Sequence, residues 1–219
     1  MKRSYEPELM DDFSIQDERV DVALNELNII NRFLGGVSTT KSALKYFFNS
    51  GNEVLSVVDI GSGSSDNLLA AKKNLPSLNI TSIDRSFRSL KFFPNSTLKL
   101  NADAFRMPVK DNSCDVVHVS LFLHHFTEEE IVCLLKKFIR ICRTGIIIND
   151  LQRSYFALIG INVLTVLFSR SELVKYDAPL SVRRGFKKND LVTLFAECGI
   201  RKYVIKRKWA FRWMVVIRK

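Results

Sequence analysis

A glycine-rich turn between an apolar run and a polar segment is the feature that most constrains the fold of this chain. The largely apolar run 57–60, interrupted only by Asp59, is followed directly by Gly61, Gly63 and small polar residues up to Asp66. The apolar run predicts a buried strand, and the glycines predict a tight turn into a helix. Such a turn lets backbone N–H groups at a helix N-terminus approach a ligand closely. The segment therefore predicts a nucleotide-binding loop.

Strand and helix patterns alternate on both sides of this turn. Helical periodicity is expected at residues 17–33, 39–48, 128–141, 153–168 and 189–198. Strands are expected at residues 54–60, 80–84, 97–101, 115–120, 145–150, 203–206 and 211–217. Pro179 falls in a predicted loop, and the last two strands are expected to form an antiparallel hairpin. The alternation predicts an α/β fold, Rossmann-like, with a mostly parallel seven-stranded sheet and helices on both faces.

Two groups of helices fall outside this core pattern. The helices of residues 1–50 precede the glycine turn and predict an N-terminal helical cap. Residues 51–219 then form the Rossmann-like domain, with an apolar helical lid expected over about 151–186. Both groups would lie over the edge of the sheet where ligands bind, although core packing would explain the apolar helix equally well.

The chain is basic, with a net charge of +10 over 219 residues. Surplus Lys and Arg favour nucleic acid, an anionic membrane or acidic small molecules, but a charge balance describes non-specific attraction rather than a site. A solvated basic surface is the simpler interpretation. Peripheral membrane contact stays open, and the oligomeric state is not indicated.

The cysteines and the N-terminus bear on location. The four cysteines have no CxxC spacing, which indicates neither disulfides nor zinc. No apolar stretch follows the basic residues at the N-terminus, so no secretory signal is expected. The nearly apolar segment 155–168 falls short of the ~20 residues that a spanning helix needs. We expect a cytoplasmic protein without a transmembrane helix.

Two aspartates follow the turn at informative intervals. Asp84 closes the next strand about 20 residues past the glycines, where a carboxylate can accept both hydroxyls of a ribose. Asp103 follows the third predicted strand. A dinucleotide fingerprint would require glycine at position 66, and Asp66 there argues against NAD. An exposed turn residue is the alternative for an isolated aspartate.

The glycine turn, Asp84 and the segment from Asp103 to Met107 and Pro108 together resemble the class I S-adenosylmethionine-dependent methyltransferases. Within that family the chain is similar to the small-molecule, ubiquinone- and menaquinone-biosynthesis type. The resemblance implies S-adenosylmethionine as cofactor, S-adenosylhomocysteine as product, and no metal. Ser65 stands where the family has a third glycine, which suggests weaker cofactor affinity. The cofactor contacts that the resemblance implies are Asp59, Gly61, Gly63, Asp84, Arg85, Asp103, Ala104 and Ser120.

Methyl transfer needs orientation of two reactants more than covalent help, so a base matters only if the acceptor must lose a proton. His124 and His125 follow the fourth strand and are the candidate bases, although they could equally shape the rim of the cofactor pocket. Asp150, Arg153 and Arg183 are the candidate contacts of the acceptor, with surface solvation as the alternative for the last.

These features predict an enzyme that methylates oxygen or carbon of a small, largely apolar aromatic or lipid-like acceptor. RNA methylation stays open because of the basic charge, although no nucleic-acid methylation motif or RNA-binding module is present. A cofactor-binding protein that no longer catalyses is the third alternative, and Ser65 is its only support.

Overall fold

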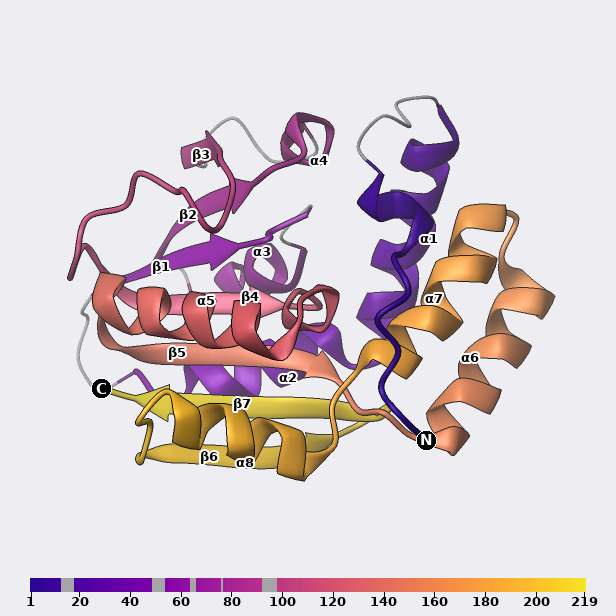
Figure 1. The fold of residues 1–219 in the computed structure, drawn as a ribbon. Coiled ribbons are helices and arrows are strands. Elements are labelled where there is room, and N and C mark those ends of the chain that lie inside the picture. Colours follow the sequence, from indigo (N-terminus) through magenta and orange to yellow (C-terminus); the bar gives the residue numbers. More distant parts are fainter. Residues whose placement is uncertain (13–17, 49–53, 64–65, 76, 92–97) are drawn as a thin grey trace.

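In the computed structural model, residues 1–12, 18–48, 54–63, 66–75, 77–91 and 98–219 are described. Seven strands form one sheet in the order β3-β2-β1-β4-β5-β7-β6 (Figure 1). Neighbours among β1 to β5 are parallel, and β7 is antiparallel to both β5 and β6. The strands are β1 Leu55–Ile60, β2 Leu78–Asp84, β3 Leu98–Asn101, β4 Cys114–Ser120, β5 Cys142–Leu151, β6 Tyr203–Lys208 and β7 Arg212–Arg218. The predicted parallel sheet and terminal hairpin are confirmed.

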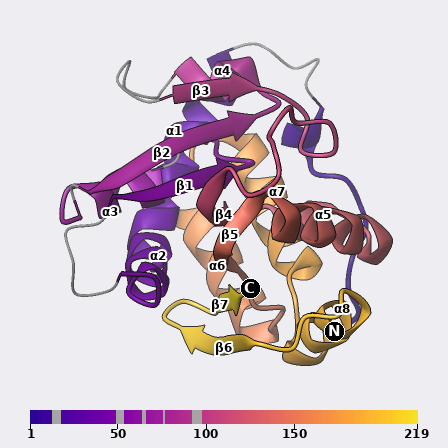
Figure 2. The same cartoon turned by 90° about the vertical axis from the view of Figure 1, so that its left-hand side faces the viewer.

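Helices cover both faces of the sheet, because consecutive strand residues point to opposite sides. Val116 packs in one apolar cluster with helices α2 (Gly36–Leu44) and α3 (Asp66–Lys72). Its neighbour Val117 packs in another with helices α5 (Glu128–Ile141) and α8 (Lys188–Glu197). Figure 2 shows the two layers on either side of the sheet, with the short helix α4 (Phe87–Lys91) beside β3.

Helix α5 illustrates how the local sequence sets these elements. The Thr127 hydroxyl accepts the N–H of Glu130, whose side chain accepts the N–H of Thr127 in return. This capping box starts the helix at the predicted residue. Apolar side chains at steps of three and four residues then face the core: Ile131, Leu134, Leu135, Phe138 and Ile141.

A third apolar cluster holds a lid over the carboxyl ends of the parallel strands (Figure 1). It joins α1 (Glu18–Phe33), α6 (Tyr155–Phe168) and α7 (Glu172–Arg184). No helix in the described part of the chain combines the length and the apolar character needed to cross a bilayer.

The predicted loop around Pro179 is wrong, because Pro179 lies inside α7. The proline removes one backbone hydrogen bond from the helix. Two features hold the helix nevertheless: Ser171 caps its first turn by accepting the N–H of Val174, and Val174 and Val182 are buried in the lid cluster. Helix α2 also differs, since it begins before residue 39 and ends at Leu44.

A buried polar network anchors α1 and α2 to the sheet beneath the lid. The Arg212 guanidinium donates to the side-chain oxygen of Asn149 at 3.1 Å and to the carbonyl of Leu34 at 2.8 Å. The Asn149 amide donates to the carbonyl of Gly36 at 2.9 Å. Burial lowers the pKa of Arg212 to about 10, so the arginine still carries its charge at neutral pH. The network fixes the corner between the two helices against β5 and β7.

Candidate active site

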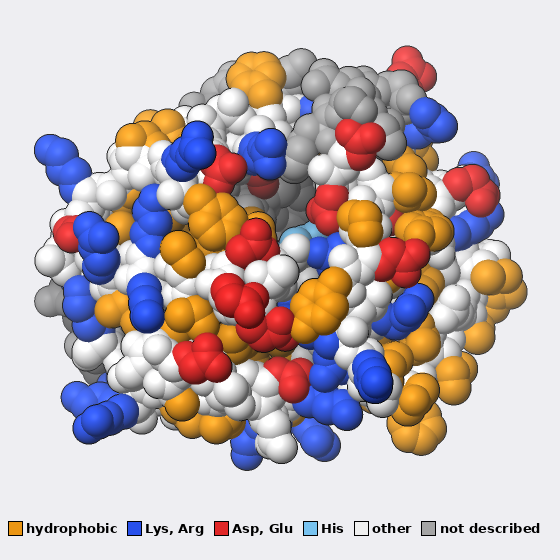
Figure 3. All heavy atoms as spheres, in the orientation of Figure 1, with side chains coloured by type: hydrophobic (Ala, Val, Ile, Leu, Met, Phe, Trp, Pro, Cys, Tyr) orange, Lys and Arg blue, Asp and Glu red, His pale blue; other side chains and the backbone are white. Residues whose placement is uncertain are grey.

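A cavity of about 910 Å³ lies between the lid and the carboxyl edge of the sheet. Figure 3 shows this face hollowed, with histidine atoms inside the hollow. The ends of three neighbouring strands line it with the predicted cofactor residues Gly61, Gly63, Asp84, Asp103 and Ala104. The glycine turn and the two carboxylates therefore converge on one cleft, as the cofactor hypothesis requires.

The two glycines of the turn have different physical roles. Both have positive φ, +62° at Gly61 and +51° at Gly63, which disfavours other residues. A Cβ at Gly61 would lie 1.9 Å from the ring of Phe122, so this glycine allows the ring to pack on the turn. A Cβ at Gly63 would meet nothing within 4 Å. Gly63 thus exposes its backbone to the cavity, whereas Ser65 lies outside the described residues.

Asp84 joins the end of β2 to the glycine turn. Its Oδ2 accepts the N–H of Gly63 and its Oδ1 accepts the N–H of Ser86, both at 2.7 Å. Burial raises the pKa of the Asp84 carboxyl, and the two N–H donors act against that rise. Each carboxylate oxygen can accept more than one hydrogen bond, so sugar hydroxyls can be added to this arrangement.

Asp103 and Ala104 follow β3, the neighbour of β2, and both line the cavity. Asp103 Oδ1 accepts the N–H of Phe105 at 2.8 Å, which holds the turn. The ring of Phe105 packs edge-on against Phe126, which packs against Phe122. These three rings also line the cavity and offer an apolar surface for a flat base.

The remaining predicted cofactor residues lie at the margin. Arg85 is exposed and lines the cavity, whereas Ser120 is not among its lining residues. The Ser120 hydroxyl instead accepts the amide of Asn67 at 2.9 Å. Their roles toward the cofactor stay predictions.

Asp59 lies beneath the turn rather than in the cavity. One carboxylate oxygen is 2.6 Å from Nδ1 of His118, and the other ring nitrogen of His118 is 3.0 Å from the hydroxyl of Thr40. Asp59 and His118 are both buried, so His118 is a residue of the core. This pair supports the strand end from which the glycine turn begins.

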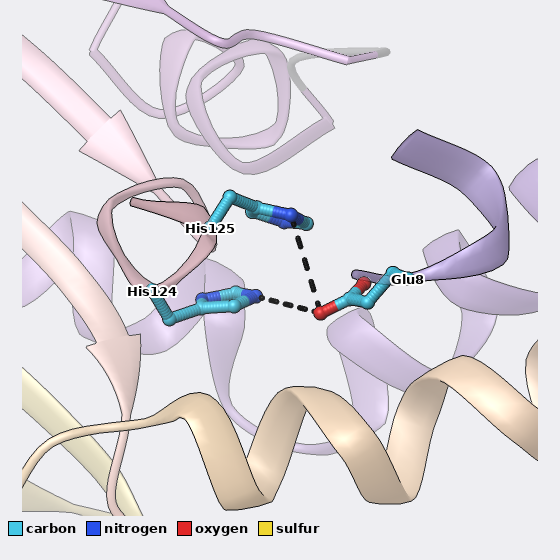
Figure 4. A group of neighbouring side chains, drawn as sticks. All are labelled: Glu8, His124 and His125. Carbon is cyan, nitrogen blue, oxygen red and sulfur yellow. Dashed lines mark ion pairs between the residues drawn. The ribbon is translucent and has the colours of Figure 1, made fainter. Parts of the chain in front are cut away.

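His124 is enclosed between two carboxylates. Its Nδ1 is 2.6 Å from Asp150 and its Nε2 is 3.6 Å from Glu8 (Figure 4). Burial alone lowers the pKa of His124, but the attraction of Asp150 and Glu8 outweighs it and raises the pKa to about 9. His124 is therefore an imidazolium at neutral pH and cannot accept a further proton there.

Both histidines line the cavity, but the side chain of His125 is 25% exposed and that of His124 only 2%. Its Nδ1 is 2.8 Å from Asp11 and 4.0 Å from Glu8, but it is not aligned for a hydrogen bond. The Arg184 guanidinium donates to the carbonyls of both histidines, at 3.1 and 2.6 Å, and fixes their backbone. His125 is therefore the more accessible of the two candidate bases, and its role as a base stays a prediction.

Glu8 and Asp11 are functional candidates that the sequence did not reveal. Both come from the N-terminal segment, and both line the cavity. Figure 4 shows the Glu8 carboxylate pointing toward the two histidines. The neighbouring Asp177 accepts the N–H groups of Leu9 and Met10 at 2.7 and 3.0 Å and holds this segment in place. Only the density of acidic residues near the start of the chain could have pointed to them.

Glu8, His124 and His125 also carry the atom types that bind metal ions. Within the described ranges, ligand atoms of Glu8, His124 and His125 lie within 4.8 Å of one another. A ligating histidine must offer an unprotonated nitrogen. The high pKa of His124 favours an ion pair with Glu8 instead, and the sequence-based expectation of no metal stays a prediction.

The predicted acceptor contacts do not line the cavity. Asp150 is buried behind His124, where it also accepts the N–H of Leu123 at 3.0 Å. Arg153 is bound to Asp190 at 2.8 Å. Arg183 is exposed and lies 3.8 Å from Glu6. Asp150 is therefore placed to position His124, and direct contact of the two arginines with an acceptor stays a prediction.

The Asp84 assignment gives a direct binding prediction. We expect Asp84→Ala to weaken binding of S-adenosylmethionine by about 1.5–3 kcal/mol, or roughly 10- to 150-fold, through loss of charge-assisted hydrogen bonds. Isothermal titration calorimetry measures the effect. Asp115→Ala is a matched control, because that aspartate pairs with Arg143 and is not among the cavity residues. Equal affinities of the Asp84 variant and the unmodified protein would refute the assignment.

Comparison with known proteins agrees with this geometry. Residues 58–149, which include the glycine turn, Asp84, Asp103 and the histidine pair, match the family model described as a methyltransferase domain. The match places a methyltransferase domain in residues 58–149, and the seven-stranded fold is the one found in class I S-adenosylmethionine-dependent methyltransferases. A search of curated protein sequences gave no significant match.

Solved structures share the fold at low identity. The plantazolicin methyltransferase BpumL, in complex with S-adenosylhomocysteine, is 17% identical, with a TM-score of 0.74 over 94% of this chain and 91% of that one. Magnesium protoporphyrin IX methyltransferase from Synechocystis, also with S-adenosylhomocysteine, is 15% identical, with a TM-score of 0.57 over 84% of each chain. A chain from Nostoc punctiforme, described as a candidate O-methyltransferase, is 14% identical, with a TM-score of 0.62 over 90% of this chain. This chain spans only 60% of that longer one.

Proposed function

We propose that the protein transfers a methyl group from S-adenosylmethionine to oxygen or carbon of a small, largely apolar aromatic or lipid-like acceptor. The observation that carries this proposal is the composition of the single cavity described above. One end has the glycine turn and the two carboxylates. The other end is formed by apolar side chains of the lid helices, among them Leu24, Leu27, Ile30, Ile161, Leu164 and Val182. An apolar site of this kind suits a ring or an acyl chain better than a polar polymer.

The chain's own residues supply position and a proton acceptor. The sulfonium of the bound cofactor supplies an activated methyl group, so the protein need not form a covalent intermediate. Asp84 and the glycine turn hold the donor, and the lid excludes water from the cleft. His125, at the junction of the two ends, takes the proton that a phenol or an activated ring carbon loses. His124, held charged between Asp150 and Glu8, orients its neighbour.

Two of the similar proteins are named for the compounds on which they act, and these names support the proposal without identifying the acceptor of the present protein. BpumL has been crystallised with azole-containing desmethyl analogues of plantazolicin. The Synechocystis enzyme is named for a magnesium porphyrin. Azoles and porphyrins both contain rings, in agreement with the apolar lining of the lid in the present protein.

The acceptor class can be tested with radiolabelled cofactor. Purified protein is incubated with methyl-labelled S-adenosylmethionine and an extract of the source cells, which is then separated into organic-soluble, RNA and protein fractions. We expect label in the organic-soluble fraction, because the acceptor end of the cavity is apolar. Asp84→Ala, assayed in parallel, should greatly reduce the label at low cofactor concentration.

The other fractions distinguish the alternatives. Label in the RNA fraction that is lost at high salt would favour RNA methylation, for which the charge of +10 is the supporting observation. Cofactor binding without label in any fraction would favour a protein that no longer catalyses. Either result would overturn the proposed acceptor class.

A further inference from the structure

Helix α6 exposes an unusual amount of apolar surface. Of nineteen large apolar side chains exposed in the described part of the chain, seven lie on this helix of 14 residues. They are Tyr155, Phe156, Ile159, Val163, Val166, Leu167 and Phe168. We call these seven residues the α6 face. Exposure ranges from 54% at Val163 to 78% at Phe168. An apolar patch of this size on a folded domain indicates a binding surface.

The opposite side of the same helix lines the active-site cavity. Ala157, Gly160, Ile161 and Leu164 are among the lining residues. Helix α6 carries no charged residue along its length. A helix that is apolar all round is normally buried on every side. Here one side closes the reaction cavity and the other is exposed at the outer edge of the lid (Figure 1).

Exposed arginines flank both ends of the α6 face. Arg170 lies two residues after Phe168, the last residue of the helix. Arg183 lies in the last turn of α7. The carbonyl of Gly185, just past the end of α7, accepts a hydrogen bond from Arg153, which lies just before α6. Apolar side chains between cations match the surface of an anionic bilayer, where rings insert and arginines meet headgroups.

The net charge of the chain favours an anionic membrane over a second copy of the protein as the partner of the α6 face. Each copy of the chain carries +10, so two copies brought together on this face would repel each other. An anionic lipid surface would attract the same charge. In Figure 3, apolar side chains with Lys and Arg beside them gather on the side of the molecule where α6 lies in Figure 1.

We propose that the α6 face docks the enzyme on anionic phospholipid membranes. The helix lies in the interface plane, with Phe156 and Leu167 among the side chains that insert between the lipids. Resting on the function proposed above, this places the lid of the cavity against the phase in which an apolar acceptor dissolves. Helix α6 then separates the cavity from the bilayer, and movement of the lid admits the acceptor from the membrane.

Flotation with lipid vesicles tests the docking directly. The full chain is mixed with vesicles of phosphatidylcholine alone or of phosphatidylcholine with phosphatidylglycerol. The test variant is Phe156→Asp with Leu167→Asp, at side chains 76% and 67% exposed. The matched control is Val54→Asp with Leu98→Asp, at 65% and 68% exposed. Val54 directly precedes β1 and Leu98 begins β3, so both control residues lie at the edge of the sheet away from the lid.

We expect the unmodified protein and the control to float with the phosphatidylglycerol vesicles, and less with phosphatidylcholine. The test variant should bind the vesicles at least about tenfold more weakly than the unmodified protein, because two inserted side chains are replaced by charges. Raising the salt concentration should reduce binding of the unmodified protein only in part. Equal flotation of test and control variants, or none of the unmodified protein, would overturn the proposal.

Two further measurements separate this proposal from the proposed function. The test variant should keep the cofactor affinity and the labelling of detergent-solubilised acceptor, because its substitutions are outside the cavity lining. Loss of vesicle binding with retained labelling supports docking. Vesicle binding without any labelling of organic-soluble material would refute the acceptor class alone. A dimer that dissociates in the test variant would show that the face binds a second copy and would overturn docking.

Discussion

Replacing His125 by Gln is expected to lower the rate of methyl transfer by about 10²–10⁴-fold, the usual contribution of a positioned acid or base. The imidazole lines the cavity, whereas a glutamine of similar size cannot take a proton. Affinity for S-adenosylmethionine should remain nearly unchanged, because the glycine turn and Asp84 are untouched. Initial rates of labelling at saturating cofactor measure the first effect, and calorimetry measures the second.

The control for this prediction is Asp11→Asn. The variant keeps His125 but removes the carboxylate 2.8 Å from its Nδ1. We expect a smaller loss of rate than for His125→Gln, because the imidazole that accepts the proton is kept. A His125→Gln variant with normal turnover would assign the histidine a packing role.

Replacing Asp150 by Ala is expected to cost about 3–5 kcal/mol in the free energy of unfolding. The carboxylate is buried and pairs with the charged His124, which would lose its main partner. It also accepts the N–H groups of Leu123 and Leu151, at 3.0 and 2.8 Å, and these would be left unpaired. Urea unfolding at pH 6 measures the loss. Asp150→Asn should lose less, because its amide oxygen can still accept one of these bonds, and a cost below about 1 kcal/mol for Ala would contradict the assignment.

The same pair predicts how stability depends on pH. The pKa of His124 is raised from 6.5 to about 9, so its stabilisation is complete below pH 6.5 and is lost as the pH rises through 9. The pKa of Asp150 is lowered from 3.8, since the attraction of His124 outweighs the opposing effect of burial. Its stabilisation is present above pH 3.8 and is lost as the pH falls through its folded pKa. We expect the free energy of unfolding to fall between pH 6.5 and 9, and this slope should be smaller in Asp150→Ala, where only Glu8 still pairs with His124.

The cofactor end of the site could be predicted from the sequence, because its residues follow the strands that carry them. Gly61 comes directly after one apolar run, and Asp84 ends the next. The two runs form parallel strands, and the carboxyl ends of parallel strands lie at one edge of the sheet. Spacing along the chain then determines proximity in space. The strands and helix α5 could be predicted for a related reason, since periodicity and capping are local signals.

The acceptor end could not be predicted in the same way, because its contacts join residues far apart in the chain. Glu8 meets His124 across more than a hundred residues, and no local pattern indicates that pairing. Helix α7 was missed for the same reason: a proline disfavours a helix locally, and tertiary packing of Val174 and Val182 overrides it. The side chain of Arg153 is of a type that binds anions, but its pairing with Asp190 depends on the fold and is not indicated by the local sequence.

The path of residues 3–12 across the mouth of the cleft has a practical consequence for handling the enzyme. Arg3 is bound to Glu128 and to the carbonyl of Phe126, so the segment is fastened well before it reaches Glu8. A purification tag fused to Met1 would crowd these attachments. A loss of rate caused by the tag would then resemble a defect in the chemical step. The C-terminal residue Lys219 lies at the far side of the sheet (Figure 1). Fusions intended for kinetic work therefore belong at that end.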